Sequence, residues 1–386
     1  MTAAAGTGTR RAGGPAMAYE HQINEHERPL ARALWERIFP EDTQAFLDAF
    51  FTLKGDNVIL GVTEREAAGA AAPDGAADRV CTAERGCEAD RLAAMIHLDP
   101  CSVVFGQRHG RPNTVRADYV VGVSTLPEYR HRGLMASLLK EAFARGAARK
   151  DPFIFLMPAN EQVYLPFDFR TVYLQTNYLT ADADALAAAG RIAGPEDCAA
   201  LAGAASTVLE AERDTYLVRD ERYFRELIEE MAAEDGKVVV LPGGYLCFWP
   251  NDDGGALVRE LVLPEPQRTR FLTAHGLRPA PEQPKIMVRP LDPAELVKPL
   301  RSDAPQTFTL EYHDDILELY DGLWTLTVGP EGGSLARQGA AEADSAPRPL
   351  FDMDPASLAE WVFGVRELPG AAGIRRPDRI LINEWI

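Results

Sequence analysis

The stretch 119–135 holds the residues whose types and spacing best fit a chemical role. Its first part, 119–125, is apolar and rich in valine, which predicts a buried strand. The basic turn Arg-His-Arg-Gly at 130–133 follows, and a helix is predicted to begin directly after it. A helix N-terminus presents free backbone N–H groups and partial positive charge, so it can bind a pyrophosphate. Gly133 would let the backbone approach such a group without a Cβ in the way.

The helix predicted after this turn is amphipathic. Its apolar face is formed by Leu134, Met135, Leu138, Leu139, Ala142 and Phe143, and its polar face by Lys140, Glu141 and Arg145. The apolar run 153–157 has the length of a strand, and the segment 158–169 follows it with Tyr164 near its middle. The order is therefore strand, basic turn, helix, strand.

The basic turn resembles the acyl-CoA pyrophosphate loop of the GNAT N-acetyltransferases, usually written R/Q-x-x-G-x-G/A. Arg130 and Gly133 match this pattern, whereas Met135 replaces the final small residue. The resemblance implies that acetyl-CoA is the co-substrate. It also implies that the loop binds the pyrophosphate mainly through backbone amides of Arg130, His131, Arg132, Gly133, Leu134 and Met135, while Val123 and Thr125 pair with the pantetheine arm.

The segment 158–169 resembles the continuation of that fold, in which a short helix begins and a Tyr precedes a Gly-Phe pair. Tyr164 and Phe169 match, while Asp168 stands where Gly is usual. By this resemblance Tyr164 is the expected general acid. A phenol with a reference pKa of ~10 can protonate a thiolate whose conjugate acid lies near ~8.5. The alternative is a core tyrosine packed beside its aromatic neighbours.

The resemblance narrows to the enhanced intracellular survival (Eis) family of tandem-domain acetyltransferases. Its marks are 34–39, 46–51, 125–130, 155–158 and the terminal LINEWI at 381–386. It implies an α+β chain with a flexible tail (1–18), a GNAT acyltransferase domain (19–179), a degenerate GNAT-like domain (180–284) and a sterol-carrier-protein-like α/β domain (285–386). The degenerate domain lacks an Arg-rich glycine turn, so it is not expected to bind CoA.

In that family the chain ends in the active site, so the α-carboxylate of Ile386 is the expected base toward the amine. A closing edge strand would explain the same apolar ending. Family placement of the first helices makes Trp35, Phe39, Asp48, Phe51 and Glu384 candidate walls of an acceptor pocket, although a core or surface position is the simpler explanation for each. His97 is expected to be a buried histidine.

The coarse pattern fits this organisation. Helices are predicted at 28–38, 43–53, 195–213, 221–233 and 355–365, and a mobile hairpin connection at 64–90. Strands are predicted at 57–62, 92–98, 101–107, 115–125, 237–241, 245–248, 256–263, 286–290, 306–313, 316–328 and 379–384.

Composition narrows the functional classes. The 386 residues are 46% hydrophobic and 25% charged, as in soluble globular proteins. A net charge of −18 disfavours nucleic acid and anionic membrane and favours a cationic small molecule, although acidity also simply confers solubility. Five scattered cysteines argue against a zinc site and for a reducing compartment. With no signal-like or membrane-length apolar run, we expect a cytoplasmic protein. No metal is expected.

These observations predict an acetyl-CoA-dependent N-acetyltransferase acting directly on a primary amine of a cationic small molecule, of aminoglycoside or polyamine type. Two alternatives stay open: a non-catalytic acyl-CoA or ligand-binding protein, and a protein-lysine acetylase. The Eis resemblance implies a homo-oligomer, specifically a hexamer.

Overall fold

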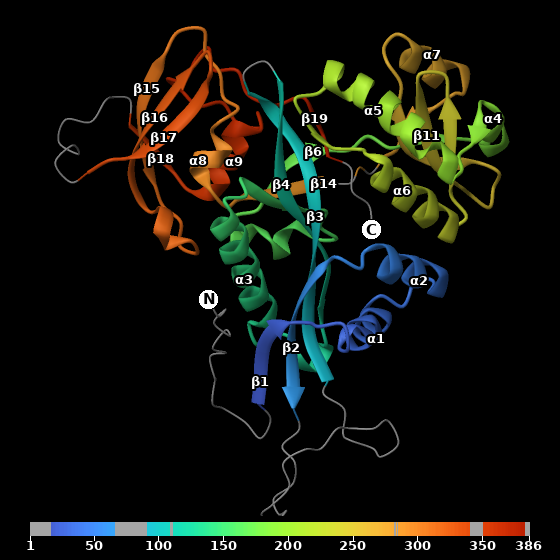
Figure 1. Ribbon diagram of the computed structural model, residues 1–386, viewed down its shortest axis with the longest axis horizontal. Coiled ribbons are helices and arrows are strands. Elements are labelled where there is room, and N and C mark those ends of the chain that lie inside the picture. Colours follow the sequence, from blue (N-terminus) through green and yellow to red (C-terminus); the bar gives the residue numbers. More distant parts are fainter. Residues whose placement is uncertain are drawn as a thin grey trace, which may run out of the picture. The chain divides into compact units, whose positions relative to one another are not determined.

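The computed structural model describes residues 17–65, 91–108, 111–281, 283, 285–339 and 350–382 (Figure 1). The chain forms two compact units that alternate along the sequence. Unit 1 comprises 1–42, 56–98 and 121–142, and unit 2 comprises 43–55, 99–120 and 143–386. This division differs from the domain boundaries predicted at 179 and 284, which stay a prediction. The hairpin connection predicted at 64–90 lies outside the described residues over 66–90.

Unit 1 is an antiparallel sheet with one helix and the start of another. It contains β1 (Met17–Gln22), α1 (Arg28–Ile38), β2 (Val58–Arg65), the first part of β3 (Arg91–Arg108), the end of β4 (Arg111–Thr125), η1 (Pro127–Tyr129) and the start of α3 (Leu134–Arg149). The α1 bounds match the prediction, with buried Ala31, Leu34 and Trp35 on one face. The sequence does not predict β1. This strand is defined by its backbone pairing with β2, and such pairing does not depend on an apolar pattern in the sequence.

β3 is one continuous strand, so the two strands predicted at 92–98 and 101–107 are wrong as separate elements. Pro100 has no backbone N–H and would break a ladder that ran through it. The strand instead changes partner around this residue: β2 pairs with it as far as Leu98, and β9 (Thr215–Leu217) pairs with it from Val103.

Within unit 2, the sheet order around the predicted acetyltransferase strands is β4, β5 (Phe153–Leu156), β14 (Lys285–Pro290) and β6 (Arg170–Leu174). The sequence predicts that 286–290 opens a third, separate unit. In the structure this strand pairs with the acetyltransferase strands, since Met287 of β14 lies opposite Leu156 on one side and Thr171 on the other. The middle of β14 is an uninterrupted, fully buried apolar run, as a central strand covered on both faces requires.

A second sheet in unit 2 has the order β13-β7-β12-β11-β10-β8. Its strands are β7 (Tyr178–Thr180), β8 (Arg191–Ile192), β10 (Lys237–Leu241), β11 (Gly244–Pro250), β12 (Ala256–Val262) and β13 (Arg278–Pro279). Its helices are α4 (Ala183–Ala188), α5 (Cys198–Glu212), α6 (Glu221–Ala233) and α7 (Gln267–Ala274). Alternate residues of β11 separate two cores: Tyr245 and Cys247 pack with α5 and α6, whereas Leu246 and Phe248 pack with α4 and α7.

The remaining part of unit 2 contains α2 (Gln44–Leu53) and a sheet of order β17-β16-β15-β18. The elements of this part are α8 (Pro293–Leu296), β15 (Gln306–Tyr312), β16 (Gly322–Gly329), β17 (Gly332–Arg337), β18 (Leu350–Met353), α9 (Pro355–Val362) and β19 (Ile380–Leu381). The strand predicted at 316–328 begins later, at Gly322. The cause is Asp314, whose carboxylate accepts backbone hydrogen bonds from Ile316 and Leu317 and starts a turn there.

A fully buried guanidinium ties three segments of unit 2 together. Arg289 of β14 donates from Nε to the Phe167 carbonyl at 3.1 Å and from Nη2 to Asp314 Oδ1 at 2.7 Å. Its guanidinium also lies 4.5 Å from the ring centroid of Phe143 in α3. A buried charge of this kind is tolerated only when it is paired and hydrogen-bonded.

Replacing Asp314 by Ala is expected to lower the free energy of unfolding by about 3 kcal/mol, because the buried Arg289 guanidinium keeps only the more distant Asp168 carboxylate, 3.9 Å from Nη2. Urea denaturation followed by circular dichroism measures this change. Asp315→Ala is the matched control, since the neighbouring carboxylate is exposed. Equal stability of the two variants would contradict the assigned role of the ion pair.

Candidate active site

The end of β4 is bent around a glycine in unit 1. Gly122 has φ +60°, and a Cβ placed on it would lie 2.3 Å from Cζ3 of Trp35. The Ser124 hydroxyl donates to the Gly122 carbonyl at 3.0 Å. Val123 and Thr125 are half-buried and alternate with buried Ser124, so the two residues predicted to bind pantetheine share one face of the strand. A positive φ inside a strand interrupts the regular ladder, which can free a backbone N–H for an oxyanion.

The basic turn has the backbone of an anion-binding loop. His131 and Gly133 both adopt left-handed conformations, with φ of 60° and 78°. A Cβ on Gly133 would meet no atom within 4 Å, so the space above it is open. The first α3 hydrogen bond runs from the Ser137 N–H to the Gly133 carbonyl, which leaves the N–H groups of residues 134–136 ahead of it. Consecutive free amides in such a turn suit a phosphate.

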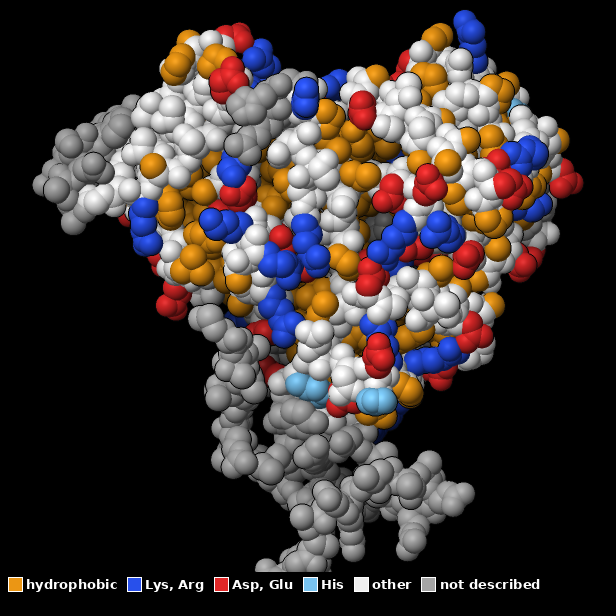
Figure 2. Space-filling view, viewed as in Figure 1, with side chains coloured by type: hydrophobic (Ala, Val, Ile, Leu, Met, Phe, Trp, Pro, Cys, Tyr) orange, Lys and Arg blue, Asp and Glu red, His pale blue; other side chains and the backbone are white. Residues whose placement is uncertain are grey.

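The arginine side chains of the turn contact its own backbone. Arg130 donates from Nε to the Thr125 carbonyl at 3.3 Å, and Arg132 donates to the Glu128 carbonyl at 2.8 Å. The Arg132 guanidinium also lies 4.9 Å from the centroid of the Tyr129 ring. These contacts brace the turn and engage both arginine side chains within the protein. Lys and Arg side chains gather over the α3 segment on the face shown in Figure 2.

The predicted amphipathic pattern of α3 is confirmed. Leu138, Leu139, Ala142 and Phe143 are buried, whereas Lys140 and Glu141 are exposed. Leu134 and Met135, at the predicted phosphate-binding end, are half-buried. The buried face fixes the helix axis, and therefore the direction in which its first N–H groups point.

In unit 2, Tyr164 lies between two short 3₁₀ turns, Glu161–Val163 and Leu165–Phe167. Burial raises the pKa of its phenol to about 12. Its ring makes an edge contact with Phe169, with centroids 5.9 Å apart. Because the raised pKa keeps the phenol protonated at any physiological pH, the group is available as a proton donor.

The loop that carries Tyr164 is held at both ends. Asn160 caps the first turn by accepting from the Gln162 N–H at 3.0 Å, and Glu161 binds the Thr171 hydroxyl and the Lys285 ammonium. Asp168 adopts a left-handed conformation with φ 63°. That conformation explains why glycine is usual at this position of the pattern and why an aspartate is tolerated, since Asp visits it more readily than most residues.

The predicted acceptor-pocket residues fall into different environments. Trp35 in unit 1 is 3% exposed, and its indole N–H donates to Asp42 Oδ2 at 2.6 Å, so it is a core side chain. Phe39 is half-buried, 5.4 Å from the Trp35 ring. In unit 2, Asp48 is exposed and Phe51 is half-buried against Phe50. Glu384 and Ile386 lie outside the described residues.

His97 is buried, as predicted, and lies edge-on to Trp35 with ring centroids 5.2 Å apart. Burial lowers its pKa to about 3, so the imidazole is neutral. Two residues that shape the structure around the site, Gly122 and Arg289, were not predicted from the sequence. Gly122 could have been identified from the sequence, because a lone glycine inside an apolar strand often marks a bulge or a close approach. Arg289 could not have been identified in this way, because no local sequence feature indicates that Phe167 and Asp314 are its partners.

No group of His, Cys, Asp or Glu among the described residues is arranged to hold a metal ion, and no described helix is long and apolar enough to cross a bilayer. Comparison with known proteins finds a match to one domain. Residues 21–172 match the family profile of the acetyltransferase (GNAT) domain. No curated protein matches the chain.

Three solved structures share the fold over most of the chain. A probable N-acyltransferase from Enterococcus faecalis is 13% identical, with a TM-score of 0.68 over 96% of this chain and 100% of that one. A GCN5-related N-acetyltransferase from Kribbella flavida is 19% identical, with a TM-score of 0.65 over 94% and 93%. Eis1 from Mycobacterium abscessus is 14% identical, with a TM-score of 0.60 over 88% of each chain. Residues 21–172 thus match an acetyltransferase (GNAT) domain, and the solved structures show that its fold extends over most of the chain.

Proposed function

We propose that the protein transfers acetyl from acetyl-CoA directly to a primary amine of a cationic small molecule, of aminoglycoside or polyamine type. The observation that carries the proposal is the turn 130–133, with two left-handed residues and the free amides of α3 directly after it. Backbone amides in this arrangement suit the pyrophosphate of an acyl-CoA. The GNAT family match supports acyl-CoA as the donor.

The transfer step assigns a task to each group. The amine nitrogen attacks the thioester carbonyl, a C–N bond forms, the C–S bond breaks, and its electron pair stays on sulfur. An N–H freed at the bend of β4 stabilises the developing oxyanion, and the Tyr164 phenol gives its proton to the leaving thiolate. The proposed acceptor of the amine proton, the α-carboxylate of Ile386, lies outside the described residues.

The acceptor class rests on charge. The chain has 58 acidic and 40 basic residues, and the resulting negative potential attracts polyamines and aminoglycosides while it repels polyanions. A small soluble amine is therefore favoured over a nucleic-acid-bound substrate. A protein-lysine acceptor carries the same reacting group, so only a direct comparison of substrates separates these two proposals.

Gly133→Ala is expected to weaken acetyl-CoA binding by about tenfold or more, because the new methyl group occupies the space through which the phosphate approaches the backbone. Isothermal titration with acetyl-CoA measures this. Gly254→Ala is the matched control, since Gly254 also has a positive φ and open space above it. Both variants should lose about 1–2 kcal/mol of stability from backbone strain. Unchanged affinity in Gly133→Ala would contradict the phosphate-binding role of the turn.

Tyr164→Phe is expected to lower kcat by about 10²–10⁴-fold, the usual contribution of a general acid, while acetyl-CoA affinity stays the same. Steady-state rates of thiol release, together with titration of acetyl-CoA, measure the two quantities. Tyr216→Phe removes another buried phenol from unit 2 and should retain the wild-type rate. A Tyr164→Phe enzyme with normal turnover would remove Tyr164 from the mechanism.

The pH dependence of kcat should rise as the acceptor amine loses its proton and should show no falling limb up to about pH 10. The physical reason is that burial raises the pKa of Tyr164 to about 12, so the acid form persists across this range. Rates measured with one amine from pH 6 to 10 test this. A decline centred near the ordinary thiol range would show that a different, more acidic group donates the proton.

A further inference from the structure

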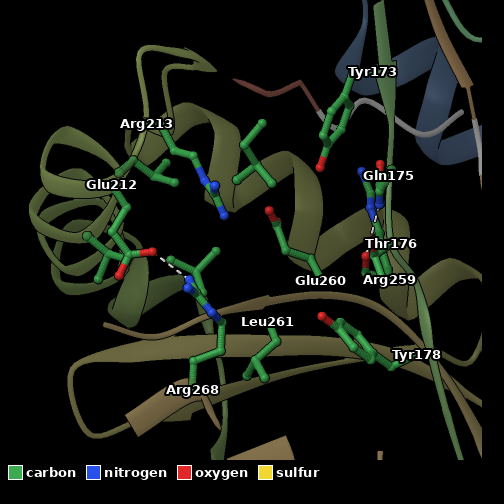
Figure 3. A pocket seen from close by; sticks show the side chains of 14 residues that line it. Tyr173, Gln175, Thr176, Tyr178, Glu212, Arg213, Arg259, Glu260, Leu261 and Arg268 are labelled. Atoms are coloured by element: carbon green, nitrogen blue, oxygen red, sulfur yellow. Dashed lines mark hydrogen bonds and ion pairs between the residues drawn. The ribbon is translucent and has the colours of Figure 1, made fainter. Parts of the chain in front are cut away.

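Unit 2 contains a cavity that uses none of the residues assigned to acetyl transfer. Its volume is about 270 Å³. Its walls come from β6 and the segment after it, α5 and the residues that follow it, β12, α7 and β19 (Figure 3). Its polar lining includes Tyr173, Gln175, Tyr178, Arg213 and Glu260. Such a volume is below the usual ~300–1,000 Å³ of drug-sized sites and suits a small metabolite.

Arg213 supplies positive charge to this cavity. Its side chain projects from the end of α5 toward the centre of the cavity in Figure 3. No salt bridge or side-chain hydrogen bond joins it to any residue that the structure describes, whereas neighbouring Glu212 is paired with Arg268 at 2.6 Å. A guanidinium presents a rigid fork of donors that matches the two oxygens of a carboxylate.

Two phenols add neutral donors beside Arg213. The hydroxyl of Tyr173 points into the cavity, and that of Tyr178 lies on its opposite side (Figure 3). Burial raises the pKa of Tyr173 to about 12, so this hydroxyl stays protonated and can donate to an anion. Neither phenol has a hydrogen-bond partner among the described side chains.

Gln175 supplies a buried acceptor. It is 2% exposed, and its amide nitrogen donates to Asn177 Oδ1 at 3.1 Å and to the Arg259 carbonyl at 3.0 Å. These two bonds fix the amide, and its oxygen Oε1 is left buried with no hydrogen-bond partner. A buried acceptor left unsatisfied costs free energy, so a ligand that donates a hydrogen bond here is favoured.

Glu260 is a carboxylate of the cavity wall whose charge is already paired within the protein. Its carboxylate points into the cavity, accepts from the Tyr245 hydroxyl at 2.8 Å and pairs with Arg219 at 2.6 Å. The Arg219 guanidinium offsets this carboxylate, and Glu212 offsets Arg268, so Arg213 supplies the positive charge that these ion pairs leave over. The wall therefore favours a monoanion over a phosphate ester or a dicarboxylate.

We propose that this cavity binds a small monocarboxylic acid that carries a hydroxyl or amino group. Its carboxylate contacts Arg213 and the Tyr173 phenol, and its hydroxyl or ammonium group donates to Oε1 of Gln175. Hydroxy acids and amino acids share this chemistry. The site is a binding site, and no covalent step takes place in it.

Isothermal titration of the full-length protein with L-lactate and with L-serine tests the proposal. The control ligands are the corresponding amides, which lack the carboxylate: lactamide is uncharged and serinamide is cationic. At least one acid should bind, and its amide should bind about tenfold more weakly or not at all. Arg213→Gln should weaken binding of that acid by about tenfold or more. Arg270→Gln removes an exposed arginine from α7 and should leave binding unchanged.

Gln175→Leu provides a second test that leaves Arg213 in place, and it should also weaken binding. Thermal unfolding of each variant confirms that it folds. Preference for lactate identifies a hydroxy-acid site, and preference for serine identifies an amino-acid site. The proposal is overturned if neither acid binds, if the amides bind as well as the acids, or if folded Arg213→Gln and Gln175→Leu proteins both bind like wild type.

Discussion

The buried guanidinium of Arg289 is the interaction on which the arrangement of unit 2 depends. It connects β14 with the Phe167 carbonyl, with the Asp314 carboxylate and with the ring of Phe143. The Phe167 carbonyl belongs to the loop that carries Tyr164, so the position of the proposed general acid is fixed by a strand far along the chain. A charge buried to this degree has few stable alternatives, which makes the loop conformation specific.

The chemistry proposed for the chain relies on backbone more than on side chains. In the basic turn the arginines brace the loop by binding carbonyls, and the left-handed residues lie beside the amides proposed to bind the phosphate. The proposed oxyanion donor at the bend of β4 is likewise a backbone group, and Gly122 is required there because Trp35 fills the space where a Cβ would be. Preorganised amides need no rearrangement when charge develops, which is the property that transition-state stabilisation requires.

The sequence predicts the local elements well and the long-range ones poorly. The bounds of α1 and the buried face of α3 follow from helical periodicity, and the turn at Gly133 follows from its residue types. The place of β14 between β5 and β6 could not be predicted, because a buried apolar strand carries no mark of its neighbours. The continuity of β3 through Pro100 depends on a change of partner strand, and the ion pair of Arg289 with Asp314 depends on tertiary contacts alone.

The measurement that tests the account most directly is thiol release from acetyl-CoA by the full-length protein with an untagged C-terminus. The acceptors are a polyamine, an aminoglycoside and a lysine-containing peptide, and mass spectrometry identifies each product. The account predicts release above the hydrolysis rate with at least one small amine, together with the N-acetylated form of that amine. Binding of acetyl-CoA without acetylation of any small amine would contradict it.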